Sequence, residues 1–513
     1  MPLRPLNRQQ TWLFPPTLDE LIPDDHPVRF IASFVDTLDD TIWQKMSVDL
    51  NGEPLGAPAY HPRALLSAWL YGFMTGTRSS RKLEAACRDQ MPYLWLTGWQ
   101  HPDHNTLWRF YKEHRAKMRH LFKLTVRTAV NMDLVDMAVQ AVDGTKIQAN
   151  AARERTYNAK GLQQLLKRTD TVIDELEKQN EAGDEPLPVH LPEKLRQSQL
   201  LRTEVKAAME RLAQEDGLKR VNLTDGDAGL MRSRQGIVAG YNIQAVVSPL
   251  KVPETENAGG VLITAVDTVQ DAEDHHQLVN MLEQAEDITG KKADITLADT
   301  GYHSGTNLAA CEQRKQRVAI PESQEHRLNP PHHNRFSYDA TTDSYVCPLG
   351  RTLKFIEMRC VVKKVVRVYG GLGAVCRLCA AFGVCTKNRY RGRELLIGPY
   401  EAVLRHHRDW MATQEAKVAY QRRKELAEPS FGIIKEQMGF RRFLLRGLYN
   451  AKAEVVMVAT AFNLRTLYRA WRWRLIKTCK TWAAGARDYI FVPLLCLIRC
   501  SNTEMSENMV TTY

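Results

Sequence analysis

The feature that most constrains the fold is an apolar run that ends in an acid. Residues 137–142 are apolar apart from one glutamine, and Asp143 follows directly. Such a run predicts a buried strand with a carboxylate at its end. A charge in that position is costly to desolvate unless a cation meets it, and a divalent metal ion is the usual partner.

A second segment of the chain repeats this arrangement. Residues 293–298, which are apolar apart from Asp294 and Thr296, lead into Asp299, which is followed by Thr300 and Gly301. Between the two acids, residues 240–247 and 260–266 have the composition of strands, and residues 276–285 have that of a helix. Two strands that end in Asp, with strands and a helix between them, fit a mixed α/β sheet whose carboxylates meet at one edge.

Helical patterns dominate the regions around this sheet. Apolar positions recur at helical spacing over residues 62–87, and Asp103 is a capping residue before a basic helix. That helix resembles the second helix of a helix-turn-helix motif, although an ordinary surface helix fits it equally well. Residues 151–218 have the pattern of a charged helical hairpin, whose role would be dimerisation, a DNA clamp or a passive insertion.

Positive charge is concentrated in the last third of the chain. Residues 351–400 contain 11 Lys and Arg against 2 Asp and Glu, and residues 401–480 contain 17 against 7. This distribution predicts a polyanionic partner, nucleic acid or an anionic membrane surface, with a solvated basic face as the alternative. We find no leader pattern and no apolar run near the roughly 20 residues of a spanning helix, so we expect a soluble cytosolic protein.

Four cysteines of this basic region have spacings that suit a metal. Cys376 and Cys379 form a Cys-x-x-Cys pair, Cys385 follows, and Cys347 lies upstream. Zn²⁺ prefers four soft ligands in a tetrahedron, so the pattern predicts a structural zinc site. Free structural thiols are the alternative, since a reducing compartment disfavours disulfides.

A third acid, Glu428, lies in a basic segment beyond the cysteines. Glu428 and Lys435 stand seven residues apart, so a continuous helix would place both on one face. Pro429 disfavours helical geometry at the residue before it. Two positions for Glu428 therefore stay open, the start of a helix or its middle.

Together these motifs resemble the DDE transposases of bacterial insertion sequences. The resemblance is carried by residues 142–146, 298–302, 428–432 with Lys435, 439–443 and 446–447. Further matches are Asn242, Asp274, Asn463, the cysteine pattern and residues 25–29. The family's third motif often has Tyr and Arg seven and four residues before the Glu, whereas Tyr420 and Arg423 each stand one residue away from those positions.

This resemblance implies an α/β fold with an RNase H-like mixed sheet flanked by helices. The implied domains are a helical DNA-end-binding domain at 1–130, a catalytic core at 131–320 and 396–475, a helical-hairpin insertion at 151–218, and a Cys-containing insertion at 321–395. We assign no structure to the tail, 476–513.

The resemblance also implies a reaction and the residues that carry it. Asp143, Asp299 and Glu428 would hold two Mg²⁺ or Mn²⁺ ions and catalyse cleavage of transposon ends and strand transfer into target DNA. The residues expected to bind DNA are Lys146, Lys435, Arg441, Arg442 and Arg446. We expect a homo-oligomer that acts on double-stranded DNA in the bacterial cytoplasm, at the nucleoid and without a membrane. The alternatives are a nuclease of the same fold and a catalytically silent DNA-binding protein.

Overall fold

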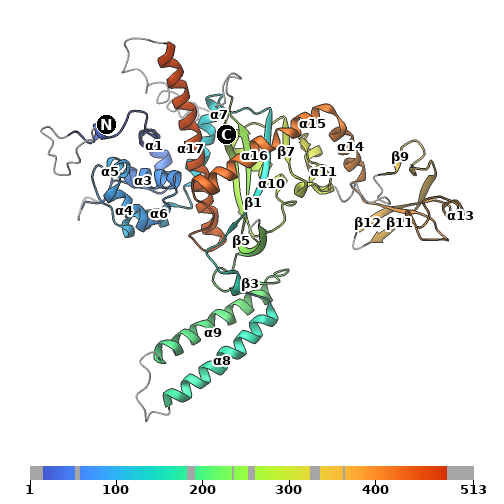
Figure 1. Ribbon diagram of the computed structural model, residues 1–513, viewed down its shortest axis with the longest axis horizontal. Coiled ribbons are helices and arrows are strands. Elements are labelled where there is room, and N and C mark those ends of the chain that lie inside the picture. The colour runs from blue at the N-terminus through green and yellow to red at the C-terminus, as the bar shows by residue number, and fades with distance from the viewer. Residues whose placement is uncertain are drawn as a thin grey trace, which may run out of the picture.

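The computed structural model describes residues 16–51, 58–181, 191–233, 236–251, 260–323, 335–361 and 364–481. Its centre is a six-stranded mixed sheet (Figure 1). The strands are β1 (Val139–Gln148), β4 (Gly229–Ser233), β5 (Gly236–Pro249), β6 (Val261–Val269), β7 (Ile295–Ala298) and β8 (Arg317–Ala319). Their order is β4-β5-β1-β7-β8, and β6 pairs with β5.

The strand that carries Asp143 is longer than its apolar run predicts. β1 continues to Gln148, so Asp143 lies in the middle of the strand and not at its end. The reason is the antiparallel pairing with β5, which joins Asp143 to Ala245 and continues to Gln148 and Gly240. Hydrogen bonds to the long neighbour keep residues 143–148 extended although their apolar pattern has stopped.

Two layers of helices cover the two faces of this sheet. On one face, Ala141 and Leu297 belong to a core shared with α16 (Arg423–Gly432), α17 (Leu448–Thr481) and the N-terminal helices. On the other face, Val142 and Ala298 pack with α10 (Leu278–Thr289), α11 (Gly305–Gln313) and α14 (Glu401–Ala412). Successive residues of a strand point to opposite faces, so Asp143 and Thr145 lie on the α16 face, and Gly144 and Lys146 on the α10 face.

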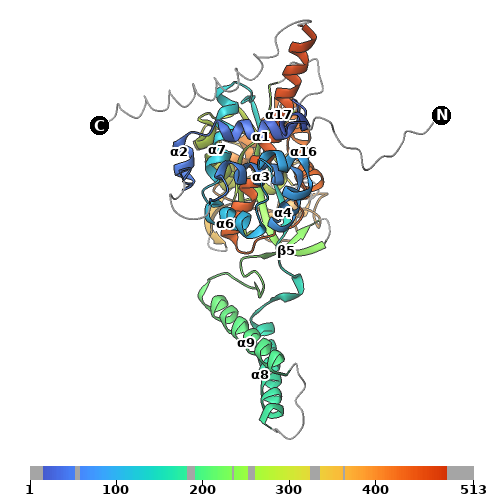
Figure 2. The ribbon, with the colours of Figure 1, turned by 90° about the vertical axis from the view of Figure 1, so that its left-hand side faces the viewer.

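The N-terminal part of the described chain is helical, as its pattern predicts. Its helices are α1 (Pro27–Asp36), α2 (Asp40–Lys45), α3 (Pro62–Thr75), α4 (Ser80–Asp89), α5 (Met91–Leu96), α6 (His104–His114) and α7 (Arg119–Asn131). Asp103 caps the basic helix α6 by accepting a hydrogen bond from Thr106 N at 2.6 Å. The helices α3 and α7 pack against the long helix α17, which joins this part to the sheet (Figure 2).

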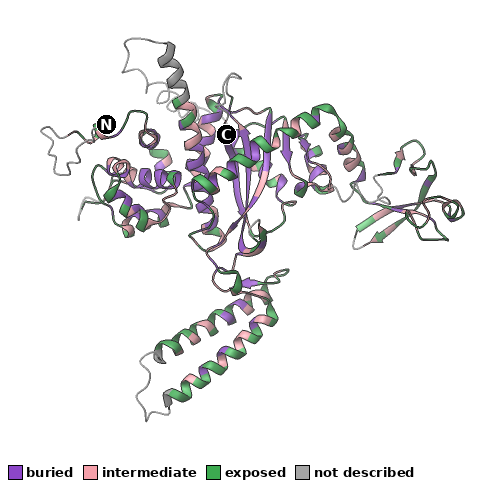
Figure 3. Ribbon diagram, viewed as in Figure 1, coloured by how far each residue is buried: buried purple, intermediate pink, exposed green. Residues whose placement is uncertain are grey.

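Two further units extend from the centre. The helices α8 (Ala159–Glu181) and α9 (Leu191–Gln214) lie side by side and project away from the sheet. Their base is closed by β2 (Thr156–Tyr157) and β3 (Val221–Asn222), which pair with each other. Figure 3 shows that most of this hairpin is exposed, in contrast to the buried central sheet. The breaker predicted at residues 183–188 lies outside the described residues.

The cysteine-containing segment forms a second, antiparallel sheet at the far end from the N-terminal helices (Figure 1). Its strands, in the order β13-β12-β11-β10-β9, are β9 (Ser337–Asp339), β10 (Ser344–Val346), β11 (Thr352–Val361), β12 (Lys364–Gly370) and β13 (Glu394–Ile397). A short helix, α13 (Gly373–Arg377), follows β12. The sheet has its own small core around Tyr345, Leu353 and Tyr369.

Beyond the sheets, α15 (Gln414–Gln421) precedes α16. None of the helices in the described ranges is long and apolar enough to cross a membrane. Of the tail that we left unassigned, residues 476–481 belong to α17, and residues 482–513 are outside the described part of the chain.

Candidate functional site

Two of the three acids meet because of the strand register. The parallel pairing of β1 with β7 ends at Val142 and Ala298, and the next residues of the two strands are Asp143 and Asp299. Beyond this point β7 stops, whereas β1 continues beside β5. The two carboxylates therefore stand together where neighbouring strands separate, on the face that α16 covers. The structure brings these two predicted acids together, but within the sheet beside the continuing strand β1 and not at an edge of the sheet.

The cation that meets these acids in the structure is Arg423. Its Nη2 lies 3.2 Å from Asp143 Oδ1 and 3.9 Å from Asp299 Oδ2. The Asp143 and Arg423 side chains are largely buried, at 17% and 13% exposure, and Asp299 is more open at 41%. Burial raises the pKa of Asp143, the Arg423 guanidinium lowers it, and the neighbouring carboxylate of Asp299 raises it again.

Glu428 lies in the middle of α16, not at a helix start. Pro429 is accommodated inside this helix, and a π-helical turn, Ile433–Gln437, follows it. Pro has no N–H for the helical hydrogen-bond ladder, and a local π-turn is one way in which a helix adjusts. The Glu428 side chain is exposed, and the described contacts join it to neither Asp143 nor Asp299.

Lys435 reaches the same strand from the π-helical turn. Its Nζ donates a hydrogen bond to Thr145 Oγ1 at 2.5 Å. Arg423 and Lys435 thus contact residues 143 and 145 on one face of β1, and Glu428 lies between the two cations along the chain. Tyr420 is also near, because the charges of Arg423, Asp299 and Asp143 all act on its hydroxyl, whose pKa burial raises.

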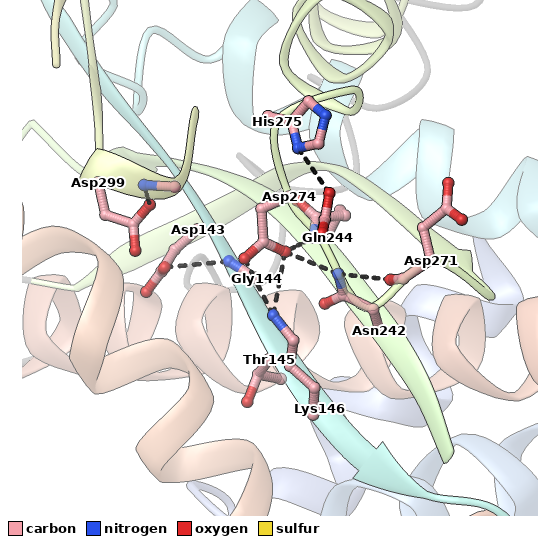
Figure 4. A network of polar contacts seen from close by, with 12 residues as sticks. Asp143, Gly144, Thr145, Lys146, Asn242, Gln244, Asp271, Asp274, His275 and Asp299 are labelled. Atoms are coloured by element: carbon pink, nitrogen blue, oxygen red, sulfur yellow. Dashed lines mark hydrogen bonds and ion pairs between the residues drawn. The ribbon is translucent and has the colours of Figure 1, made fainter. Parts of the chain in front are cut away.

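On the opposite face of β1, Lys146 is paired with an acid. Its Nζ lies 2.9 Å from Asp274 Oδ2, and both side chains are mostly buried. Figure 4 shows this pair with Asn242 and Gln244, which also donate to Asp274, at 2.6 and 2.7 Å. Lys146 was predicted to bind DNA, whereas the structure directs its ammonium group to Asp274.

The three predicted arginines lie near the far end of β1. Arg442 Nε and Arg446 Nε donate to the backbone oxygens of Ala149 and Asn150, each at 3.3 Å. Arg441 pairs with the exposed Glu436. At about 3.3 Å per residue, the five residues from Asp143 to Gln148 put this group roughly 17 Å along the strand from the acids.

The four predicted zinc ligands lie in the second sheet. Cys347, Cys376, Cys379 and Cys385 all line one pocket, and none of them forms a disulfide. Backbone N–H groups donate to two of the sulfurs, from Arg351 to Cys347 at 3.3 Å and from Ala381 to Cys379 at 3.4 Å.

Within the described ranges, no group of three or more His, Cys, Asp or Glu side chains is arranged to hold a metal ion. This applies to the predicted acids and to the predicted thiolates. For the acids, the described contacts bring exposed Glu428 to neither aspartate, and the guanidinium of Arg423 lies between Asp143 and Asp299. Two carboxylates with a buried cation between them have the donor chemistry that a hard divalent ion prefers.

Some contacts of the site carry little sequence signal. Gln244 and Tyr302 hydrogen-bond to each other although 58 positions separate them. The sequence marks Thr145 only as a member of the motif at residues 142–146. The family's third motif does point to Arg423, because Tyr420 and Arg423 each stand one residue from the positions that Tyr and Arg usually have in that motif.

Two family models match this chain. Residues 16–113, which contain α1 to α5 and all but the last residue of α6, match a family described as a transposase domain (DUF772). Residues 346–468, which contain the cysteines, Arg423, Glu428 and Lys435, match a transposase DDE domain. Asp143 and Asp299 lie outside both matched ranges. No curated protein and no solved structure matches the chain.

Proposed function

Because the chain belongs to the DDE transposases of insertion sequences, we propose that it binds the terminal inverted repeats of its element and catalyses DNA cleavage and strand transfer. The observation that carries this proposal is the adjacency of Asp143 and Asp299 where β1 and β7 separate, with Arg423 between them. Carboxylates in close contact repel each other unless a cation is present, so such a pair suits metal-dependent phosphoryl transfer.

The topology of the sheet supports an RNase H-like core. Three antiparallel strands, β6, β5 and β1, are followed in space by β7 and β8, which run parallel to β1. In chain order these five strands are β1, β5, β6, β7 and β8. Asp143 belongs to the first of them, Asp299 follows the fourth, and Glu428 belongs to a later helix. The proposed domains keep their predicted limits, with residues 1–130 as the part that recognises the DNA ends.

We assign Mg²⁺ or Mn²⁺ to the acids on the chemistry of their oxygens. Asp143 and Asp299 would hold the ions with Glu428, which α16 presents between Arg423 and Lys435. In phosphoryl transfer, two such ions activate the attacking oxygen and stabilise the leaving one. Arg423 keeps the two aspartates together by neutralising part of their charge, and Lys435 orients Thr145 beside them.

The chain's basic residues would bind the DNA backbone. Lys435 lies beside the acids, and Arg441, Arg442 and Arg446 extend a positive surface along the exit of β1. Lys and Arg contacts to phosphates supply affinity without reading the sequence. We propose that double-stranded DNA passes from the acids toward these arginines, and that two or more copies of the chain pair the transposon ends.

A strand-transfer assay separates this function from its rivals. Purified protein is incubated with Mg²⁺, pre-cleaved ends that carry the inverted repeats flanking the coding region, and a target plasmid. A transposase joins the ends to the plasmid, a nuclease of the same fold cuts DNA without joining, and a silent DNA-binding protein binds the ends without breaking any strand. Either of the last two results would contradict the proposal.

We also propose that the four cysteines hold a structural Zn²⁺, which prefers four thiolates. The supporting observation is that one pocket gathers all four thiols, two of which accept backbone hydrogen bonds. Metal analysis of the purified protein should find about one zinc ion per chain.

The zinc proposal has a matched control within the same sheet. Cys379→Ser should lower the zinc content, whereas Cys360→Ser should not, because Cys360 is exposed on β11 and does not line the pocket. Purified wild-type protein that contains no zinc under reducing conditions would contradict the proposal.

A further inference from the structure

A polar network lies directly behind the candidate acids, on the α10 face of β1 (Figure 4). Asp274 is at its centre and accepts hydrogen bonds from Asn242 Nδ2, Gln244 Nε2 and Lys146 Nζ, at 2.6, 2.7 and 2.9 Å. Asn242 and Gln244 are fully buried on β5. A buried carboxylate with three donors is fixed in place, because each lost hydrogen bond would leave a buried polar group without a partner.

This network packs against the backbone of β1 beside Asp143. A Cβ atom at Gly144 would lie 2.5 Å from Gln244 Nε2 and 2.8 Å from Asp274 Oδ1. The lack of a side chain at Gly144 therefore lets the amide and the carboxylate approach the strand itself. The Gly144 N–H in turn donates to Asp143 Oδ1 at 3.0 Å. The position of Asp143 thus depends on a peptide unit that the network supports from behind.

The same network reaches the turn that carries Asp299. Gln244 Oε1 accepts a hydrogen bond from the hydroxyl of Tyr302, which is fully buried. Burial and the nearby carboxylates raise the pKa of Tyr302, so the hydroxyl remains a donor. Tyr302 ends the short turn Thr300–Tyr302, in which the Gly301 N–H donates to Asp299 Oδ1 at 2.8 Å.

Asn307 fixes this turn from the other side. Its Nδ2 donates to the backbone oxygens of Tyr302 and His275, at 2.9 and 2.5 Å. Since His275 follows Asp274 directly, the turn of Asp299 and the loop of Asp274 are held to each other twice, once through Gln244 and once through Asn307.

We propose that Gln244, Asp274 and Tyr302 are positioning residues, which hold Asp143 and Asp299 at the spacing that a divalent metal ion requires. This inference rests on the proposed function. Gln244 is the link, since its amide N–H binds Asp274 behind Gly144 and its oxygen binds Tyr302 behind Asp299. Lys146 belongs to this network as the counter-charge of Asp274.

Tyr302→Phe tests the proposal with the smallest change, because it removes one hydroxyl and keeps the ring. Supporting residues around metal ligands typically change metal affinity or activity by about 10–100-fold. We expect Tyr302→Phe to raise the half-saturating Mn²⁺ concentration about 10-fold or more, measured by the electron paramagnetic resonance signal of free Mn²⁺. End binding without metal should stay unchanged.

The matched control is Tyr241→Phe. Tyr241 is also fully buried, stands on the same strand as Gln244, and donates its hydroxyl to the carboxylate of Asp225 at 2.8 Å. Removal of the Tyr241 hydroxyl should lower the Tm by about as much as Tyr302→Phe does, and it should leave Mn²⁺ binding unchanged. A structural role alone would therefore move the Tm of both variants and the Mn²⁺ affinity of neither.

The outcomes separate this inference from the proposed function. Wild-type protein that binds Mn²⁺, with Tyr302→Phe binding it as tightly, would overturn the positioning role and leave the function intact. Wild-type protein that binds no Mn²⁺ with its DNA ends present would overturn both. Weaker Mn²⁺ binding in Tyr302→Phe and not in Tyr241→Phe is the result that the proposal predicts.

Discussion

Val142 and Ala298 form the last register pair between β1 and β7, and this pairing brings the two candidate aspartates together. The residues that follow the pair, Asp143 and Asp299, emerge on the same face of the sheet because side chains alternate along both strands. Their proximity therefore follows from the register of the central sheet, with Asp299 as the first residue after β7. Chemistry built on such a frame keeps its geometry when surface loops change.

Arg423 should compete with metal ions for the two aspartates. Arg423→Gln removes the counter-charge, so in EDTA we expect a Tm several degrees lower, from a loss of about 1.5–3 kcal/mol for a hydrogen bond between charged groups. Added Mg²⁺ should then raise the Tm of the variant more than that of the wild type, as measured by differential scanning fluorimetry. An equal Mg²⁺ shift in both proteins would contradict this role for Arg423.

Arg441 and Lys146 should contribute differently to the salt dependence of DNA binding. Each lysine or arginine that contacts a phosphate contributes about 0.9 to the slope of log K against log salt concentration. Arg441→Met should reduce this slope by about that amount. Lys146→Met should leave it unchanged, because Lys146 faces Asp274. The slope is measured by fluorescence anisotropy. An equal loss of slope in both variants would show that Lys146 contacts a DNA phosphate.

The ion pair between Arg78 and Glu454 should be the main polar link between the N-terminal helices and α17. Both side chains are buried, and Glu454 also accepts hydrogen bonds from the Leu444 and Leu445 N–H groups, at 3.1 and 3.2 Å. Arg78→Met leaves this carboxylate without its cation, which costs about 3–5 kcal/mol for a buried pair. Chemical denaturation measures this loss in the free energy of unfolding.

The control for this prediction is an exposed ion pair on the hairpin. Arg155 and Glu204 are 2.8 Å apart and about half exposed. Arg155→Met should cost less than about 1 kcal/mol, because solvent screens such pairs. Equal losses of unfolding free energy in the two variants would contradict the role of the Arg78–Glu454 pair as the main polar link.

The hairpin should be dispensable for folding. It has its own core around Leu162 and Val205, and β2 and β3 close its base through the pairs Thr156 with Asn222 and Tyr157 with Val221. Replacing residues 159–219 by a short Gly-Ser turn should keep cooperative unfolding and change the Tm of the rest by only a few degrees. Loss of the cooperative transition in circular dichroism would contradict this prediction.

The sequence was most informative where local pattern decides the structure. The strands before Asp143 and Asp299 were predictable, because an apolar run of this length needs burial in a sheet. The extension of β1 to Gln148 was not, since it depends on pairing with β5 about a hundred residues later. The hydrogen bonds around Gln244 depend in the same way on residues that only the fold brings together.

For Glu428 the sequence left two positions open, the start of a helix or its middle. Pro429 has competing effects on a helix, and packing of the neighbouring residues Leu426 and Phe431 favours the helix. Arg423, the first residue of α16, meets Asp143 although it stands one residue from the family's usual position. This contact depends on how α16 lies against β1, which the spacing of the motif alone does not give.

The most direct test of the account is Mg²⁺-dependent cleavage of the cognate ends by variants of the three acids. Asp143→Asn, Asp299→Asn and Glu428→Gln should each abolish cleavage and retain end binding. The controls are Asp294→Asn, which lies just before β7, and Glu425→Gln, which is exposed on α16; both should cleave like the wild type. Full cleavage by any one of the three acid variants would contradict the account.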